Sequence, residues 1–234
     1  MKAFALLSAA ELRLLARDPG SLFFMVAFPL MLLILNSGGE GPEIEIFLPG
    51  YIVMILAIGG LSALPATVAT YRERKVLRRL AATPVAPLTL LAAQIGAQIV
   101  MGLAGSAIVV GVGVLGYGAG LPDHVAVSLL AFLLCALMLY ALGFVIAALA
   151  PRAKAAELLG LLVMFPMIFL GGAAIPREGL SEELLRMGEH LPLTYAVTAL
   201  RDGWFGSPGA LPLLVLAGIT VIGTAVAAVL FRWE

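Results

Sequence analysis

The sequence predicts an all-α integral membrane protein with six transmembrane helices, an N-terminal interfacial helix, a cytoplasmic amphipathic helix and short extracytoplasmic helices before the last span. Hydrophobic residues make up 62% of the 234 residues and charged residues only 12%, whereas about a quarter of the residues of a soluble domain are charged. The mean hydropathy is +1.09. The single cysteine, Cys135, excludes a disulfide within the chain and is expected to pack in an apolar run.

Residues 1–20 are predicted to form a helix that lies in the membrane interface. One helical arc holds Phe4, Leu7, Leu14 and Leu15, and another holds Lys2, Arg13 and Arg17, which is typical of interfacial helices. A secretory signal is the weaker alternative, because its apolar core would be short and no soluble domain follows. Glu11 falls inside the apolar arc, where it is either solvated or covered by protein, with an arginine of segment 72–79 as its partner.

Six apolar runs are long enough to cross a membrane, since a helix rises about 1.5 Å per residue and the hydrocarbon core is about 30 Å thick. Pro29 predicts a kink in the first run. Segment 176–209 is too small and too apolar for a separate domain, so we expect two re-entrant helices, 181–189 and 194–204, against the outer membrane face. The predicted spans are residues 21–37, 47–70, 88–117, 125–150, 157–175 and 210–231.

Segment 71–87 carries the densest positive charge of the chain. As a helix it places Leu77 and Leu80 on one face, and Pro84 would end it near Ala82. Such a rod is either a positively charged anchor at the membrane surface or a docking lever for a partner. Its five basic residues are Arg72, Arg74, Lys75, Arg78 and Arg79.

The distribution of charge predicts the orientation. Eleven of the 14 Lys and Arg residues lie in the N-terminal segment, the 71–87 loop, the 151–154 loop and the C-terminus. Basic residues concentrate on the cytoplasmic side. We therefore expect a multi-pass protein of the cytoplasmic (inner) membrane with both termini in the cytoplasm, and extracytoplasmic loops at 38–46 and 176–209.

No Asp, Glu, Lys, Arg or His lies inside the six predicted spans, and Glu157 sits at the mouth of the fifth. Ion-coupled carriers and voltage sensors place ionisable groups in the membrane, so the sequence argues against both classes. It also lacks a phosphate-binding G-x-x-x-x-G-K-[ST] loop and any constellation typical of a nucleophilic or metal-dependent enzyme. We expect a chain that is not an enzyme by itself, binds no cofactor or metal and no nucleic acid, and takes energy from another polypeptide.

The uncharged polar residues of the spans could line a path or pack helices together. Gln94 and Gln98 are one turn apart on one face, where a hydrogen bond to a neighbouring helix is favoured over contact with a substrate. Glu157 is expected to form an interfacial ion pair with Arg152 or Lys154. The other candidates are Ser62, Thr67, Ser106 and Tyr140.

Five motifs along the whole chain resemble those of the ABC-2-type transporter permeases, the membrane subunits of bacterial ABC exporters, and the likeness extends to daunorubicin-efflux and polysaccharide-export permeases. Each motif alone is weak, but their order and spacing are specific. They are ELRLLARDP (11–19), LPG (48–50), RE…LRRLAATPV (72–85), a glycine-rich stretch that closes on Pro176, and PLTYAVTALRDG (192–203).

The resemblance implies how the chain would work. Segment 71–87 would hold a coupling helix that fits a groove on a separate ABC ATPase, present in two copies with its own ATP and Mg²⁺. Residues 1–20, with Glu11, Arg13 and Arg17, would form the connecting helix, and a second copy of the chain or a related permease would complete the path. The coupling residues would be Arg72, Glu73, Val76, Leu77, Arg78, Arg79, Leu80, Thr83 and Pro84.

The leading functional hypothesis is therefore the permease subunit of an ATP-driven exporter for an amphipathic or lipophilic substrate, such as a drug, a lipid or a glycoconjugate. A six-span scaffold or regulatory component that docks a cytoplasmic partner without moving a substrate is one alternative. A passive channel is another. ATP-dependent movement of a substrate distinguishes the first reading from both.

Overall fold

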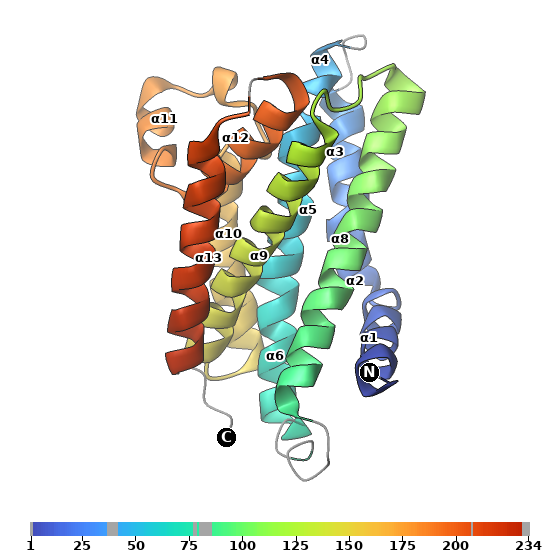
Figure 1. Ribbon diagram of the computed structural model, residues 1–234, viewed down its shortest axis with the longest axis vertical. Coiled ribbons are helices and arrows are strands. Elements are labelled where there is room, and N and C mark those ends of the chain that lie inside the picture. Colours follow the sequence, from blue (N-terminus) through green and yellow to red (C-terminus); the bar gives the residue numbers. More distant parts are fainter. Residues whose placement is uncertain (1, 37–41, 77–78, 80–85, 207, 231–234) are drawn as a thin grey trace.

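A computed structural model describes residues 2–36, 42–76, 79, 86–206 and 208–230. Every regular element in these residues is helical, and the longer ones run side by side as a bundle (Figure 1). The elements are α1 (Lys2–Leu15), α2 (Pro19–Leu22), η1 (Phe23–Ala27), α3 (Phe28–Asn36), α4 (Pro42–Glu45), α5 (Leu48–Ala57), η2 (Ile58–Ala63), α6 (Leu64–Glu73), α8 (Pro87–Tyr117), α9 (Val125–Leu149), α10 (Ala153–Leu170), η3 (Arg177–Gly179), α11 (Glu182–Gly188), α12 (Pro192–Phe205) and α13 (Ala210–Leu230).

The second predicted span forms the centre of the bundle. It is built from α5, η2 and α6, and all ten residues of α5 are buried. In its most apolar stretch 78% of residues are buried, compared with 28% in α8 and 17% in α13. The apolar outer faces of α8 and α13 are therefore available to lipid, whereas the central span packs against protein on all sides.

Within the described residues, five helices are long and apolar enough to cross a membrane: Leu48–Glu73, Leu88–Tyr117, Val125–Leu149, Ala153–Leu170 and Ala210–Leu230. The remaining predicted span, 21–37, is occupied by α2, η1 and α3, whose apolar part from Phe23 to Asn36 is shorter. The chain is thus an all-helical, multi-pass membrane protein. The count of six spans stays a prediction.

Two of the spans contain π-helical turns, and a proline follows each of them. In η1 the Phe28 N–H donates to the Phe23 carbonyl, immediately before Pro29. In η2 the Leu64 N–H donates to the Gly59 carbonyl, immediately before Pro65. Because proline has no N–H and its ring crowds the carbonyl four residues back, a wider preceding turn relieves the clash. The kink predicted at Pro29 is thus a π turn that precedes the proline.

Tight helix crossings surround η2. A Cβ atom added at Gly143 of α9 would overlap the Gly60 carbonyl oxygen, and one added at Gly160 of α10 would overlap that of Leu61. Backbones can approach this closely only where a side chain is missing. These two glycines bring α9 and α10 into direct backbone contact with the central span.

Segment 176–209 contains the turn η3 and the helices α11 and α12, close to the ranges predicted from the sequence, and their re-entrant, extracytoplasmic placement stays a prediction. They lie at the end of the bundle opposite the start of α1 and the end of α13 (Figure 1). Eight residues of α12 are buried, and α12 contacts α5, α9, α10 and α13. The fifth predicted span, 157–175, is shifted, because its helix runs from Ala153 to Leu170 and the chain then turns at Gly172, which has a φ of 83°.

We call the end of the bundle that holds the start of α1, the end of α6, the α9–α10 turn and the end of α13 the basal end (Figure 1). The helix predicted for segment 71–87 does not form as one continuous element at this end. Tyr71 to Glu73 continue α6, the chain turns at Arg74 and Lys75, and Lys75 has a φ of 54°. Beyond this turn the Arg79 N–H donates to the Lys75 carbonyl at 3.1 Å.

Candidate functional site

A groove of about 900 Å³ runs between the first and fifth predicted spans, with the central span as its floor. One wall comes from α2, η1 and α3, and the other from α10 and the segment after it. The lining residues are Asp18, Gly20, Phe24, Phe28, Leu32, Asn36, Phe47, Met54, Ile58, Ser62, Ala63, Glu157, Leu161, Met164, Phe165, Ile168, Phe169, Ala174, Ile175 and Pro176.

The groove is mainly apolar and carries polar groups at its ends. Asp18 caps α2 by accepting from the Gly20 N–H at 3.2 Å, and it lies near the basal end. Asn36, at the other end, donates to the Tyr51 hydroxyl at 3.2 Å. None of the lining residues in the described part of the chain is basic. An apolar channel with a few convergent polar groups suits an amphipathic or lipophilic molecule.

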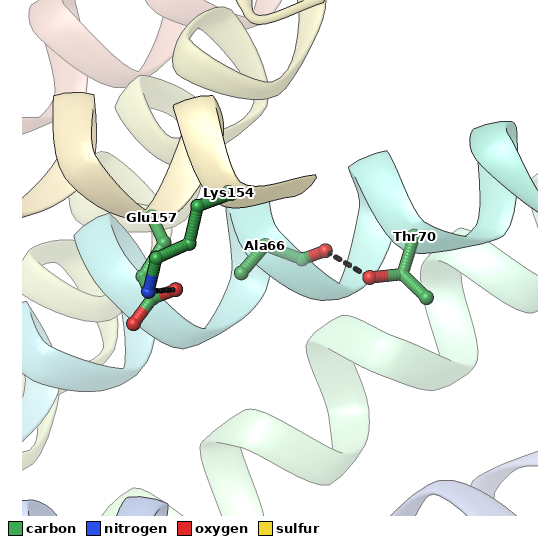
Figure 2. A network of polar contacts seen from close by, with 4 residues as sticks. All are labelled: Ala66, Thr70, Lys154 and Glu157. Atoms are coloured by element: carbon green, nitrogen blue, oxygen red, sulfur yellow. Dashed lines mark hydrogen bonds and ion pairs between the residues drawn. The ribbon is translucent and has the colours of Figure 1, made fainter. Parts of the chain in front are cut away.

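The basal mouth of the groove is bordered by an ion pair on α10. Lys154 Nζ lies 2.8 Å from Glu157 Oε2, as the sequence predicted, and Figure 2 shows the pair beside α6. On that helix the Thr70 hydroxyl donates to the Ala66 carbonyl at 2.8 Å. Both side chains of the ion pair are largely solvated, so the pair contributes little to stability.

Three consecutive residues at the end of α6 each bond to a different element. The Tyr71 hydroxyl donates to Glu11 Oε1 of α1 at 2.5 Å. The Arg72 guanidinium donates to the carbonyls of Ala147, at 3.1 Å, and Ala150, at the end of α9. The Glu73 carboxylate accepts from the Ala153 N–H at 2.8 Å, where α10 begins. The end of α6 therefore connects α1, α9 and α10.

Glu11 is the buried acid of the basal end. Its residue is only 4% exposed, so it is not solvated, and its hydrogen-bond partner in the described part of the chain is Tyr71. Burial raises the pKa of Glu11, and the hydrogen bond from Tyr71 partly offsets that increase. Glu11 and Leu15 of the apolar arc are thus buried where α1 packs along α8, whereas Phe4 and Leu14 of the same arc are exposed, as are Arg13 and Arg17.

The two amides of α8 are enclosed without hydrogen-bond partners. Gln94 is 1% exposed and Gln98 is fully buried, and none of their four side-chain polar atoms has a partner in the described part of the chain. A Cβ atom at Gly59 would lie 3.0 Å from Gln98 Oε1, which places this amide against η2. The predicted hydrogen bond to a neighbouring helix is absent there.

With this geometry established, a comparison with family models decides the family. Residues 2–205 match the model of the ABC-2 type transporter, which covers every described element except α13. The chain belongs to the ABC-2 type transporter family. No curated protein matches the chain in a sequence search. The match is to the family as a whole, so the narrower likeness to daunorubicin-efflux permeases stays a prediction.

Membership of the ABC-2 family makes the chain a membrane transporter component, the permease of an ABC transporter that works with a partner ATPase. Family members of this kind are not enzymes by themselves.

Only part of the predicted site of this ABC-2 chain falls in the groove. Ser62 lines it. The Thr67 hydroxyl bonds to the Ala63 carbonyl of its own helix at 2.9 Å, and Ser106 and Tyr140 are buried away from the lining residues. Among the coupling residues, Val76 is half-buried and Arg79 is exposed. Leu77, Arg78, Leu80, Thr83 and Pro84 lie outside the described residues.

Sequence reasoning missed the aromatic lining of the groove and the partner of Glu11. Four phenylalanines, Phe24, Phe28, Phe165 and Phe169, line the groove from its two walls. Their spacing within each helix, four residues, was a usable signal for one face. The sequence does not distinguish a helix face that lines a groove from a helix face that contacts lipid, because both are apolar.

Proposed function

We propose that the chain is the permease subunit of an ATP-driven exporter that moves an amphipathic or lipophilic substrate, such as a drug, a lipid or a glycoconjugate, along the groove. The observation that carries this proposal is the groove itself. It is mainly apolar, only a few polar residues line it (Asp18, Asn36, Ser62 and Glu157), and two π-helical segments border it. Helices with π turns repack at low cost and are frequent at functional sites.

Energy for transport would come from a separate ABC ATPase in two copies, which bind ATP and Mg²⁺. Segment 71–87 is the docking lever in this proposal. Its described part supports an exposed basic surface, because Arg74, Lys75 and Arg79 are all exposed. In this reading the basal end is cytoplasmic, which agrees with the excess of basic residues there.

A second copy of the chain would close the open side of the groove. Large apolar side chains stand exposed along both walls, with Phe24 at 51% and Phe165 at 46%. Two symmetry-related copies that face each other would cover both walls and enclose one shared path. A homodimer is therefore the simplest assembly, with a related permease as the alternative partner.

The test uses the chain reconstituted with an ABC ATPase in inside-out vesicles, with a fluorescent phospholipid and a lipophilic fluorescent dye as probes. We expect the ATPase to co-purify with the chain and ATP to drive accumulation of at least one probe. Probe movement without ATP would support a passive channel. ATPase binding without movement of any probe would support a scaffold, and either result would refute the exporter.

A further inference from the structure

Arg72 and Glu73 hold the two sides of one helix–helix turn. We propose that these two residues transmit motion: they make the α9–α10 turn follow the end of α6, so that displacement of segment 74–86 by the ATPase moves α10 and changes the groove. The proposal rests on the proposed function, because it assumes an ATPase that displaces this segment.

The first connection is made to the end of α9. The last carbonyls of a helix have no partners within the helix and carry a partial negative charge. Arg72 donates to two such carbonyls, those of Ala147 and Ala150, with two different nitrogens of its guanidinium. A planar, permanently charged group that bonds two acceptors fixes both distance and orientation.

The second connection is made to the start of α10. The residue at the N-cap position of this helix is Arg152, whose side chain makes no capping hydrogen bond. The acceptor comes instead from Glu73, 80 residues earlier in the chain, which accepts from the Ala153 N–H at 2.8 Å. A carboxylate at a helix N-terminus is favoured by the free N–H groups and by the helix dipole.

Small residues let these bonds act over a close contact. Ala69 of α6 is buried with Ala150 and Ala156 in a cluster of its own, and Ala153 and Ala155 pack against it. Alanines have no side-chain rotamers that could absorb a shift, so backbones in contact through them move together. The end of α6 and the α9–α10 turn therefore form one rigid block.

The block reaches the groove through α10. This helix supplies Glu157, Leu161 and Phe165 to one wall, and it touches η2 through the backbone at Gly160. A displacement of its basal end, with the Gly160 contact as a pivot, would change the width of the groove. The segment displaced by the ATPase begins directly after Glu73, so no other described element lies between the lever and this block.

The experiment follows the groove directly, without a substrate. Phe165→Cys in a Cys135→Ala background supplies one thiol in the groove of the reconstituted complex. A water-soluble maleimide then measures its labelling rate without nucleotide and after trapping with ATP and vanadate. The variants are Arg72→Ala, Glu73→Ala and Glu73→Gln, and Arg152→Ala is the matched control, since it removes one cation from the same turn.

We expect nucleotide trapping to change the labelling rate in the parent complex and in Arg152→Ala. In Arg72→Ala and Glu73→Ala, that change, measured only on complexes that have retained the ATPase, should fall by about half or more, because one of two connections is lost. Glu73→Gln keeps an oxygen that can accept from Ala153 and should retain most of the change. If the two residues had a purely structural role, the variants would instead lower the melting temperature and the yield of complex as much as they lower the change in labelling rate.

Two results would overturn the proposal in different ways. A full nucleotide-dependent change in both alanine variants, or no change in a parent complex that does bind the ATPase, would refute the transmission role and leave docking intact. If no ATPase binds the parent chain, the proposed function fails and the transmission role fails with it.

Discussion

Replacing both buried amides of α8 by methionine should stabilise the protein. Gln94 and Gln98 leave the N–H₂ and the carbonyl of each side chain without a partner in the described part of the chain. Burying an unpaired polar group costs about 1–3 kcal/mol. Methionine has the same unbranched shape and no strong polar atom.

The two substitutions together should raise the free energy of unfolding by about 2 kcal/mol, the lower end of the range for two groups, since neighbouring sites are not additive. Methionine is preferred to leucine at position 98 because the amide oxygen lies close to Gly59, where a branched side chain would crowd the backbone.

Cys135 provides the assay. It is the single cysteine and it is fully buried, so a maleimide that fluoresces on reaction will label it only when the helices separate. The control is Thr67→Val, which removes a hydroxyl that is bonded within its own helix and should change the melting temperature little. A lower melting temperature for the double methionine variant would refute the reasoning, because it would show that hydrogen bonds to the two amides stabilise the fold by more than burial of the amides destabilises it.

Three further predictions concern other parts of the chain. Burial raises the pKa of Glu11 above 4.5, so the folded state binds a proton more tightly than the unfolded state does. The free energy of unfolding of the parent chain, relative to that of Glu11→Gln, should therefore fall as pH rises from 4.5 through the raised pKa. A difference in melting temperature between the two chains that is independent of pH would contradict this. Gly160→Val would overlap the Leu61 carbonyl oxygen and should cost about 3 kcal/mol, measured by labelling of Cys135, with unchanged melting as the contrary result. Leu80→Asp should insert normally but lose ATPase co-purification, because an unpaired carboxylate in the docking contact costs several kcal/mol; normal binding would return segment 71–87 to a simple charged anchor.

The sequence by itself determined the features that depend on short-range order. Uninterrupted apolar runs locate α8, α9 and α13 to within one or two residues, because a helix in lipid must satisfy all its backbone hydrogen bonds internally. The ion pair of Lys154 and Glu157 was also predictable, because the two residues are only three positions apart and meet within one helical turn.

Tertiary structure alone decided which apolar faces meet protein. The helices α5 and α13 read alike in sequence, yet one is fully buried and the other mostly exposed. In water, burial and hydrophobicity go together, but lipid is as apolar as a protein core, so hydrophobicity does not separate the two environments in a membrane. The groove between the first and fifth predicted spans depends on which apolar helix faces pack against protein, so it follows from the tertiary structure.

Tertiary structure also decided the polar partners that lie far apart in the chain. Tyr71 meets Glu11 across 60 residues, and Glu73 meets the start of α10 across 80. The sequence showed that Glu11 interrupts an apolar arc, but it did not show that α10 begins at Ala153 and takes its capping acceptor from Glu73. Only the packing of α6 against α1 and against the α9–α10 turn brings Tyr71 and Glu73 within hydrogen-bonding distance of their partners. A hydrogen bond requires contact at about 3 Å, and the spacing of residues along the chain does not determine which distant residues come that close.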